Sequence, residues 1–368
     1  MLLALAFAAL LLAPSTAFAA GRLEPTVAAS PTSDILPCTR TVKSFTAAAV
    51  AAARDASGVN GTVCFPAGTY PGDLTASVAG QRWQLDDDAK LTGILQITAA
   101  HVTLFNGQIV RPVVDRWLAS VQIRADYATI QSVLISGGGT GVGVYGKDYG
   151  RILSNRFTGL TGSAVSVWSE GVGADYTYIK SNQIDQTKTF QVSPITSRGN
   201  ESGGHGGVQN YRTTIRGNII NQGAGNIGWF GIELKQSKGA VIEKNTMTGG
   251  IVLVSLPETD NALIRWNTFD LRGTAHWGIE VGNAYDATVT ENTFIGDGRT
   301  GVDYALEMNT NPLRTIVTNN TASNIRTLVA IAGDYHQILD NCLTNVAYAT
   351  EFMLNGGPHI VVKGNGPC

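Results

Sequence analysis

The stretch IEKNTM, residues 242–247, decides the fold, because its pattern recurs between residues 152 and 365. In each copy a few residues that favour β-strands precede an asparagine, and another strand-like run follows it. The asparagines are Asn155, Asn182, Asn218, Asn245, Asn267, Asn292, Asn320, Asn341 and Asn365. Their successive spacings are 27, 36, 27, 22, 25, 28, 21 and 24 residues. A period in the low-to-middle twenties, with strands throughout, predicts a β-solenoid.

Asparagine suits the corners of such a solenoid for two reasons. It tolerates the left-handed backbone conformation that a tight corner needs, and its amide can hydrogen-bond along a stack of equivalent residues. A second strand stands before each asparagine-bearing strand, as in FGIELK (residues 230–235), and a third follows it. Three short strands per turn describe an all-β fold, the right-handed parallel β-helix.

Both ends of such a solenoid need caps, because each coil leaves its core face open to the next. Residues 42–52, VKSFTAAAVAA, have the pattern of a short amphipathic helix, so we expect a capping helix at about residues 42–55. VCFPAGTY, residues 63–70, then opens the first coil. A helix followed by V-x-F-P-x-G-x-Y resembles the start of pectate-lyase-like β-helix proteins. With the repeat, this resemblance covers nearly the whole mature chain. It implies the fold and leaves the reaction open, since that superfamily contains lyases, hydrolases, epimerases and phage tailspikes.

The bulk composition narrows the class of partner. The 368 residues are 43% hydrophobic and 15% charged, with a net charge of −2, so neither nucleic acid nor an anionic membrane is an implied partner. Residues 1–20, MLLALAFAALLLAPSTAFAA, are apolar and end in small residues, which predicts a secretory signal followed by a single domain at 21–368. No later stretch is long and apolar enough to span a bilayer. We therefore expect an exported protein, extracellular or periplasmic, and a monomer.

The cysteines fit an exported protein. There are four of them, Cys38, Cys64, Cys342 and Cys368, and their spacing is unlike that of a zinc site. An even number in an exported chain predicts disulfides, and three pairings are possible. The pairs Cys38–Cys64 and Cys342–Cys368 would each staple one end of the chain.

The first strand of each coil predicts two columns of outward side chains, because alternate residues of a strand share a face and neighbouring strands lie about 4.8 Å apart. The expected inward pairs are Val142/Val144, Val165/Val167, Ile232/Leu234, Ile251/Leu253, Ile279/Val281 and Leu306/Met308. The first outward column is Gly143, Ser166, Gln209, Glu233, Val252, Glu280 and Glu307. The second outward column is Tyr145, Trp168, Tyr211, Lys235, Val254, Gly282 and Asn309.

These columns predict a binding site for a sugar polymer. Lys235 stands one rung from Tyr211, which extends an aromatic wall, and Glu233 stands one rung from Gln209. Aromatic faces beside a polar strip suit sugar rings, whose faces are apolar and whose edges need hydrogen bonds. The wall consists of Tyr145 and Trp168, and Trp229 is a further candidate platform.

A long insertion adds polar groups to this place. Residues 187–207, TKTFQVSPITSRGNESGGHGG, fall in the longest gap between corner asparagines and are rich in glycine and serine. We expect a site loop that brings Arg198, Asn200 and His205 to the substrate.

Such residues can perform β-elimination on a uronic-acid polysaccharide. A base removes the proton at C5, a cation or hydrogen-bond donor neutralises the adjacent carboxylate, and an acid protonates the departing O4. We predict Lys235 as the base and Tyr211 as the acid. Gln209, His205 or Arg198 would hold the carboxylate.

The lysine coil carries a second resemblance. KQSKGAVIEKN, residues 235–245, is similar to the catalytic-lysine coil of β-helix alginate lyases and chondroitinase-B-like lyases, which implies a catalytic role for Lys235. In those enzymes two acidic residues bind Ca²⁺ and an arginine further on is the acid. Here only Glu233 closely precedes Lys235 and no clear partner arginine follows, so a lysine–tyrosine scheme resembles polysaccharide lyase family 31 more closely. No cofactor is expected. The alternative is Ca²⁺, with Glu233, Glu280 and Glu307 as candidate ligands.

The sequence therefore predicts an exported lyase that acts on a uronate polymer, with alginate as the leading substrate. Three alternatives stay open: a polygalacturonase-like glycoside hydrolase, a uronan C5-epimerase, and a non-catalytic β-helix that binds polysaccharide. Hydrolysis would need two carboxylates flanking the scissile bond. A lyase creates a C4–C5 double bond that absorbs ultraviolet light, a hydrolase creates only reducing ends, and a binding protein does neither.

Overall fold

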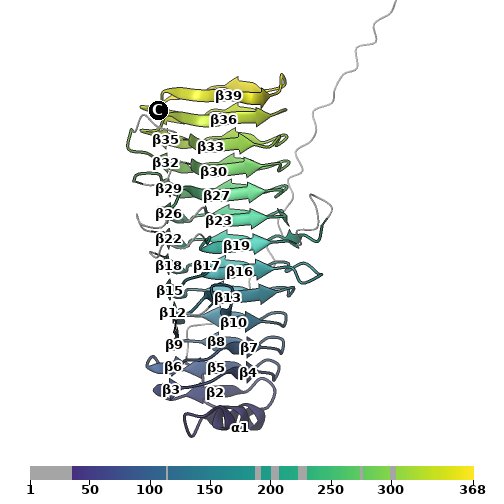
Figure 1. Ribbon diagram of the computed structural model, residues 1–368, viewed down its shortest axis with the longest axis vertical. Helices are drawn as coiled ribbons and strands as arrows, with labels where there is room; N and C mark the ends of the chain where they lie inside the picture. The colour runs from purple at the N-terminus through teal and green to yellow at the C-terminus, as the bar shows by residue number, and fades with distance from the viewer. Residues whose placement is uncertain are drawn as a thin grey trace, which may run out of the picture. The chain divides into compact units, whose positions relative to one another are not determined.

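Short parallel strands repeat in a fixed order and stack coil upon coil (Figure 1). A computed structural model describes residues 35–112, 115–186, 192–199, 207–222, 230–273, 277–298 and 304–368. Residues Pro37–Cys368 form one compact unit. In the described residues of that unit each strand pairs with its equivalents in the coils before and after, which makes a right-handed parallel β-solenoid with three long sheets, as predicted.

The three sheets take one strand each from successive coils. The 14-stranded sheet contains β1 (Arg40–Thr41), β2 (Thr62–Phe65), β5 (Arg82–Leu85), β8 (Thr103–Phe105), β11 (Thr129–Gln131), β14 (Arg151–Leu153), β17 (Tyr178–Lys180), β21 (Thr214–Arg216), β25 (Val241–Glu243), β28 (Leu263–Arg265), β31 (Thr288–Thr290), β34 (Ile316–Thr318), β37 (Gln337–Leu339) and β40 (Val361–Lys363). The 12-stranded sheet contains β4 (Leu74–Ala76), β7 (Leu95–Ile97), β10 (Ala119–Ile123), β13 (Thr140–Tyr145), β16 (Val165–Trp168), β19 (Ile195–Arg198), β23 (Phe230–Lys235), β27 (Val252–Pro257), β30 (Trp277–Gly282), β33 (Tyr304–Asn309), β36 (Thr327–Gly333) and β39 (Tyr348–Gly356). The 13-stranded sheet contains β3 (Gly68–Tyr70), β6 (Ala89–Leu91), β9 (Gln108–Arg111), β12 (Leu134–Gly137), β15 (Arg156–Thr158), β18 (Gln183–Asp185), β22 (Ile219–Asn221), β26 (Thr246–Thr248), β29 (Thr268–Asp270), β32 (Thr293–Ile295), β35 (Thr321–Ser323), β38 (Cys342–Thr344) and β41 (Gly366–Pro367). A two-stranded pair, β20 (Asn210–Tyr211) and β24 (Ser237–Lys238), lies outside these sheets.

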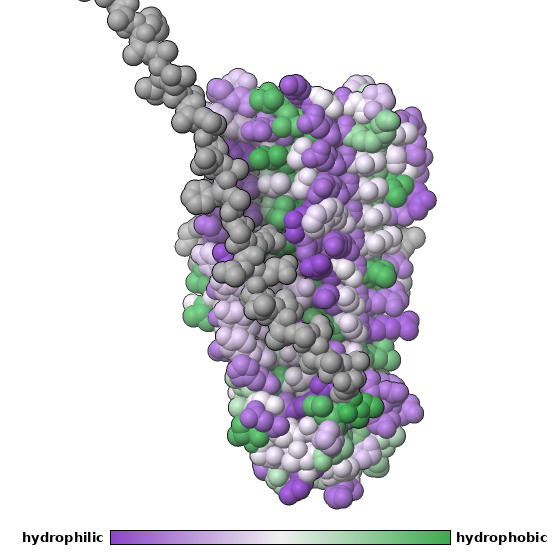
Figure 2. All heavy atoms as spheres, turned by 180° about the vertical axis from the view of Figure 1, so that it is seen from behind, coloured by the Kyte–Doolittle hydropathy of each residue, from purple (hydrophilic) through white to green (hydrophobic). Residues whose placement is uncertain are grey.

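The core lies between the three sheets, where inward side chains from successive coils stack. Of the six expected inward pairs, five are buried and face the core, among them Ile232/Leu234 and Ile279/Val281. Outside the grey atoms, the face seen in Figure 2 intersperses hydrophilic and hydrophobic residues, as expected when the apolar side chains are buried between coils.

The corner asparagines form a continuous ladder inside the solenoid. Asn245 is typical: its Nδ2 donates to the Oδ1 of Asn267 at 3.0 Å and to the carbonyl of Ile215 at 2.9 Å, and its Oδ1 accepts from the backbone N–H of Asn218 at 2.9 Å. Equivalent bonds run from Asn155 to Asn365. The predicted stack is therefore confirmed.

The left-handed corner residue is the neighbour of each asparagine, so the prediction that asparagine itself adopts this conformation was wrong. Ser181, Lys244 and Glu291, each just before a ladder asparagine, have φ values of 56°, 58° and 56°. The reason is that the turn aims the following side chain inward, where the asparagine amide satisfies buried backbone groups of the adjoining coils.

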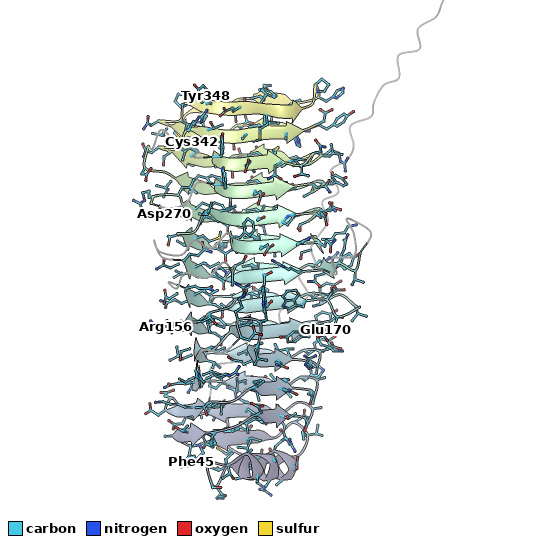
Figure 3. The ribbon with its side chains drawn as sticks, in the orientation of Figure 1. Phe45, Arg156, Glu170, Asp270, Cys342 and Tyr348 are labelled. Atoms are coloured by element: carbon cyan, nitrogen blue, oxygen red, sulfur yellow. A yellow bond between two sulfur atoms is a disulfide. The ribbon has the colours of Figure 1, made fainter. Side chains whose placement is uncertain are left out.

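The predicted capping helix and a disulfide at each end of the solenoid are present. Helix α1 (Ala47–Ser57) packs Val50 and Ala53 into the core, and it begins later than expected because the Thr46 side chain caps it by accepting from the N–H of Ala49. Disulfides join Cys38 to Cys64 and Cys342 to Cys368, which resolves the pairing that the sequence left open. Phe45, beside α1, and Tyr348, at the start of β39, lie toward the two ends of this unit in Figure 3. Among the described residues, no helix combines the length and apolar character that crossing a bilayer requires.

A buried histidine near the last coils makes stability depend on pH. His336 accepts a hydrogen bond at Nδ1 from the N–H of Thr315 and donates from Nε2 to the carbonyl of Ala332, so it is neutral, and its burial lowers its pKa. The His336 side chain takes up a proton near pH 6.5 in the unfolded chain, while the folded chain resists protonation. The stabilisation that neutral His336 gives above about pH 6.5 is therefore lost as the pH falls.

We expect the difference in urea midpoint between the wild type and His336→Gln to narrow between pH 7.5 and pH 5. A constant gap would contradict this role.

Candidate functional site

The strand that precedes β23 in the 12-stranded sheet is β19, which differs from the expected one. In register, Trp168 pairs with Arg198 and Arg198 with Lys235. Thr196 stands beside Glu233 in the neighbouring column. The strand comes from within the predicted site loop, so Arg198 enters the sheet itself. The loop is shorter than expected, and the backbone N–H of Gly199, just after β19, donates to the carbonyl of Lys235.

Tyr211 lies at the corner that leads from the 12-stranded to the 14-stranded sheet. It pairs with Lys238 in β20–β24, and its N–H donates to the Oδ1 of Asp175 at 2.9 Å. The predicted place of Tyr211 one rung from Lys235, and of Gln209 one rung from Glu233, is therefore wrong. The physical reason is that β19 already supplies the hydrogen-bonding edge between β16 and β23, which leaves residues 209–211 to form the corner.

The register of β27 also differs from the expected one. Ser255, rather than Val252, stands beside Glu233, and Val254 packs inward beside Ile232. Leu253 and Val254 are both buried, so strict alternation is broken there and the expected inward pair Ile251/Leu253 was wrong. An uninterrupted apolar run carries no signal for which residues face outward.

The predicted aromatic wall is present and leads to two cations. Tyr145 and Trp168 are paired in register, and Arg198 and then Lys235 continue their column. The guanidinium of Arg198 lies 5.7 Å from the centre of the Trp168 ring. The ring of Tyr145 lies over Gly143, where an added Cβ would come within 2.6 Å of the phenol oxygen.

A groove of about 320 Å³ opens beside this column on the outer face of the 12-stranded sheet. Its lining residues are Trp117, Ser163, Trp168, Val192, Ser193, Thr196, Arg198, Phe230 and Glu233. Trp117 comes from the connection between β9 and β10 and meets Trp168 edge-on, with ring centres 6.4 Å apart. Trp117 is not among the site residues predicted from the sequence. The signal that could have found it is a tryptophan in a short connection, since such a residue is usually buried or engaged.

Charge inside the groove is balanced by one ion pair. Arg198 contacts Glu233 at 2.7 Å, and the hydroxyl of Ser193 donates to the same carboxylate oxygen at 3.2 Å. Glu233 is 8% exposed, so it serves to hold the Arg198 guanidinium in the groove floor. Lys235 lies on β23, the strand that also carries Glu233, and it stands beside Arg198 of β19.

A buried hydroxyl in the groove has no hydrogen-bond partner among the residues that the structure describes. Thr196 is 4% exposed and lines the groove, and its Oγ1 makes no hydrogen bond to any described residue. A buried hydroxyl without a partner costs stability, so its presence in a groove points to a bound ligand that supplies the missing bond.

Farther along the same outer face, two glutamates differ in environment. Glu280 accepts hydrogen bonds of 2.7 Å from Ser255 Oγ and from Asn309 Nδ2. Glu307 pairs with Glu280 in register, and the structure records no hydrogen bond or ion pair for its carboxylate within the described residues. Burial, and then the Glu280 carboxylate, raise the pKa of Glu307. The two carboxylates therefore differ in environment: Glu280 is hydrogen-bonded to neutral donors, and Glu307 is the carboxyl group whose pKa is raised.

The remaining candidate residues are placed as follows. Ser255 separates Glu233 from Glu280 in the column, and in the described part of the chain no three His, Cys, Asp or Glu side chains are grouped to hold a metal ion. Asn200, His205 and Trp229 lie outside the described residues.

Comparisons with known proteins agree with this architecture. A family model for the right handed beta helix region matches residues 119–269 and 184–313, which together span more than half of the chain. No curated protein sequence matches the chain. Among solved structures, the surface adhesin PfbA of Streptococcus pneumoniae is 13% identical with a TM-score of 0.60, over 86% of this chain and 88% of the adhesin.

Two further solved structures are similar to the same degree. The Dettilon tailspike protein is 14% identical with a TM-score of 0.62, over 82% of this chain and 64% of the tailspike. A mannuronic acid specific polysaccharide family 6 lyase from human gut microbiota is 15% identical with a TM-score of 0.61, over 84% of this chain and 82% of the lyase. At such identities the likeness is one of fold. By the match to the family model and by its three-sheet solenoid, the chain belongs to the right-handed β-helix family.

Proposed function

We propose that this protein is an exported lyase that cleaves a uronic-acid polysaccharide, with alginate as the leading substrate, by β-elimination at Lys235. The observation that carries the proposal is the adjacency of Arg198 and Lys235 at the end of an aromatic wall. Two cations side by side on a sheet suit a sugar that bears a carboxylate. A similar solenoid belongs to a mannuronic acid specific lyase, and mannuronate is a component of alginate.

The groove matches the two faces of a uronate ring. Trp117 and Trp168 offer apolar surface to the C–H face of a sugar. Thr196 offers a hydroxyl that lacks a partner within the described residues, and a sugar hydroxyl or ring oxygen would supply one. The guanidinium of Arg198 has five N–H donors and is held by Glu233, so it is oriented for a second carboxylate, that of the substrate.

Arg198 and Lys235 divide the reaction between them. Arg198 neutralises the uronate carboxylate, which stabilises the negative charge that develops when C5 loses its proton. Lys235, in its neutral form, takes that proton; the C5–H electron pair forms the C4–C5 double bond, and the C4–O4 bond breaks. The ammonium of Lys235 then returns the proton to O4. This assignment replaces Tyr211 as the acid, since its backbone lies at the corner.

The test is a screen of alginate, glucuronan, pectate and chondroitin for ultraviolet absorbance of the new double bond. We expect absorbance to rise with at least one uronate polymer, in step with new reducing ends. Reducing ends without absorbance would contradict the proposal and indicate hydrolysis. If neither absorbance nor reducing ends increase and the protein still binds the polymer, it is a binding protein and not an enzyme of this kind.

Thr196→Val tests the unpartnered hydroxyl. Valine has nearly the same shape, so the free energy of unfolding should stay the same or rise by up to about 1 kcal/mol, because a buried hydroxyl without a partner is removed. We expect KM for the polymer to rise about three- to tenfold, as a hydrogen bond of roughly 1 kcal/mol is lost. The measurement is steady-state kinetics with urea unfolding as the control. Unchanged KM with raised stability would show that the hydroxyl does not contact substrate.

Glycoside hydrolysis is a second candidate because one observation favours it specifically. Glu280 and Glu307 stand on adjacent rungs; Glu280 accepts two hydrogen bonds, and burial raises the pKa of Glu307, as in carboxylate pairs that divide nucleophile and acid roles. This function predicts cleavage that is lost in Glu307→Gln and kept in Lys235→Ala.

A further inference from the structure

The outer column that includes Glu233 changes its charge along the solenoid. On the N-terminal side of the groove it is uncharged, and on the C-terminal side it is acidic. The uncharged members are Gln96, Gln122, Gly143, Ser166 and Thr196. The members from β23 onward are Glu233, Ser255, Glu280, Glu307, Ala330 and Glu351. A linear polymer lying on this sheet therefore meets different surroundings in its two directions.

Within the described residues, two of these carboxylates have no cation paired with them. Glu233 is paired with Arg198, and Glu351 with Arg326 at 2.9 Å. In the part of the chain that the structure describes, Glu280 accepts bonds from neutral donors only, and Glu307 has no recorded partner. Negative charge is therefore concentrated on β30 and β33, two and three rungs beyond Lys235.

The two directions also differ in cations and rings. Toward the N-terminal coils, the column of Lys235 runs through Arg198, Trp168 and Tyr145, and Arg124 lies over the Tyr145 ring at 4.5 Å. Arg124 is paired with the exposed Glu170 at 3.3 Å, at the edge where the strands end (Figure 3). This side offers aromatic faces and guanidinium groups to a polyanion. The groove with the unpartnered Thr196 hydroxyl lies on the same side.

We infer that Glu280 and Glu307 end the binding track for a uronate chain, so that the polymer lies on the N-terminal side of Lys235 and short products leave from one chain end. This inference rests on the proposed lyase function. The distance sets the product length: β30 lies two rungs, about 10 Å, beyond β23. That span holds roughly two sugar units, because one rung is close to the length of one pyranose ring. A third uronate would place its carboxylate against Glu280 and Glu307, within the screening length of about 8 Å at physiological salt.

The experiment compares the wild type with Glu280→Gln/Glu307→Gln, which removes the charge and keeps the shape. We expect the wild type to release mainly one- and two-sugar products from the first minutes of digestion. The double variant should release longer products early, with kcat/KM on long polymer raised about tenfold. Glu291→Gln is the matched control, because Glu291 is an exposed carboxylate at a corner outside the sheet face. It should behave as the wild type.

Three outcomes separate this inference from the proposed function. Products of all lengths from the outset in the wild type, unchanged in the double variant, would overturn the inference and keep the lyase. Loss of all cleavage in Glu307→Gln alone would overturn it in favour of hydrolysis. If no polymer is cleaved, the inference is tested by titrating oligouronates of two to eight units. It is supported if the longer oligomers bind more tightly to the double variant than to the wild type, and Glu291→Gln binds them as the wild type does. Equal binding by the double variant and the wild type overturns it.

Discussion

Lys235→Ala is expected to abolish unsaturated product, lowering kcat/KM by about 10³-fold or more, since a positioned general base contributes roughly 10²–10⁴-fold. In our scheme the same amine also returns the proton to O4, so its removal ends both proton transfers. Alanine at this outward position leaves the inward residues of β23, Ile232 and Leu234, in place. The measurement is the initial rate of ultraviolet absorbance on the best polymer of the screen.

Two controls sharpen this test. Lys238→Ala removes an amine three residues away, at the corner, and should keep activity within about threefold, since surface changes of this kind have small effects. Tyr211→Phe should do the same, because the phenol lies on the same corner strand pair rather than in the column of Lys235. A Lys235→Ala protein that folds normally and keeps full activity would remove the site. Loss of activity in Tyr211→Phe would restore the tyrosine as the acid.

Asn245→Ala is expected to lower the free energy of unfolding by about 4 kcal/mol, because several buried groups lose partners of roughly 1–3 kcal/mol each. The backbone N–H and the Nδ2 of Asn218 both donate to its Oδ1 at 2.9 Å. The carbonyl of Ile215 accepts from its Nδ2 at 2.9 Å. No solvent reaches this position, since Asn245 is 1% exposed.

Urea unfolding of the wild type and the variant measures this loss. Asn345→Ala is the control: Asn345 is exposed and donates to Asn324 at the surface, and its φ of 51° adds backbone strain to alanine, so its loss should be about 1–2 kcal/mol. Because each coil contacts only its neighbours, hydrogen exchange should speed up most in the coils that adjoin β25 and β26. Equal, small effects for the two variants would show that the ladder is not a main source of stability.

Asn245 and Lys235 lie in parts of the molecule that the sequence specifies to different degrees. Asn245 repeats with eight equivalents, and each copy has the same local reason to stand at a corner. Lys235 occurs once, and its neighbours come from segments separated by an irregular insertion. The ladder was therefore predictable as a pattern, while the partners of Lys235 required the register between coils.

The column around Lys235 shows that local sequence patterns do not determine which strands pair between coils. ITSR (195–198) and the run 208–211 both alternate well enough to be the strand before β23, and the choice between them moved Arg198 into the site and Tyr211 out of it. Trp117 reaches the groove from the connection before β10, which lies two coils before β16. Local sequence patterns do not predict a contact between residues so far apart in the chain.

By itself the sequence determined the three-strand coil, the asparagine ladder, the capping helix and the alternation of most core residues, because all of these follow from side-chain periodicity within short segments. It also singled out Lys235, Glu233, Trp168 and Tyr145 as neighbours on one outer face. Only the tertiary structure decided the disulfide pairing, the placement of Arg198 beside Lys235 and the acidic rungs beyond them. Those features depend on which strand edges pair between coils, and pairing energy is nearly the same for any short strand of suitable alternation until the whole stack is assembled.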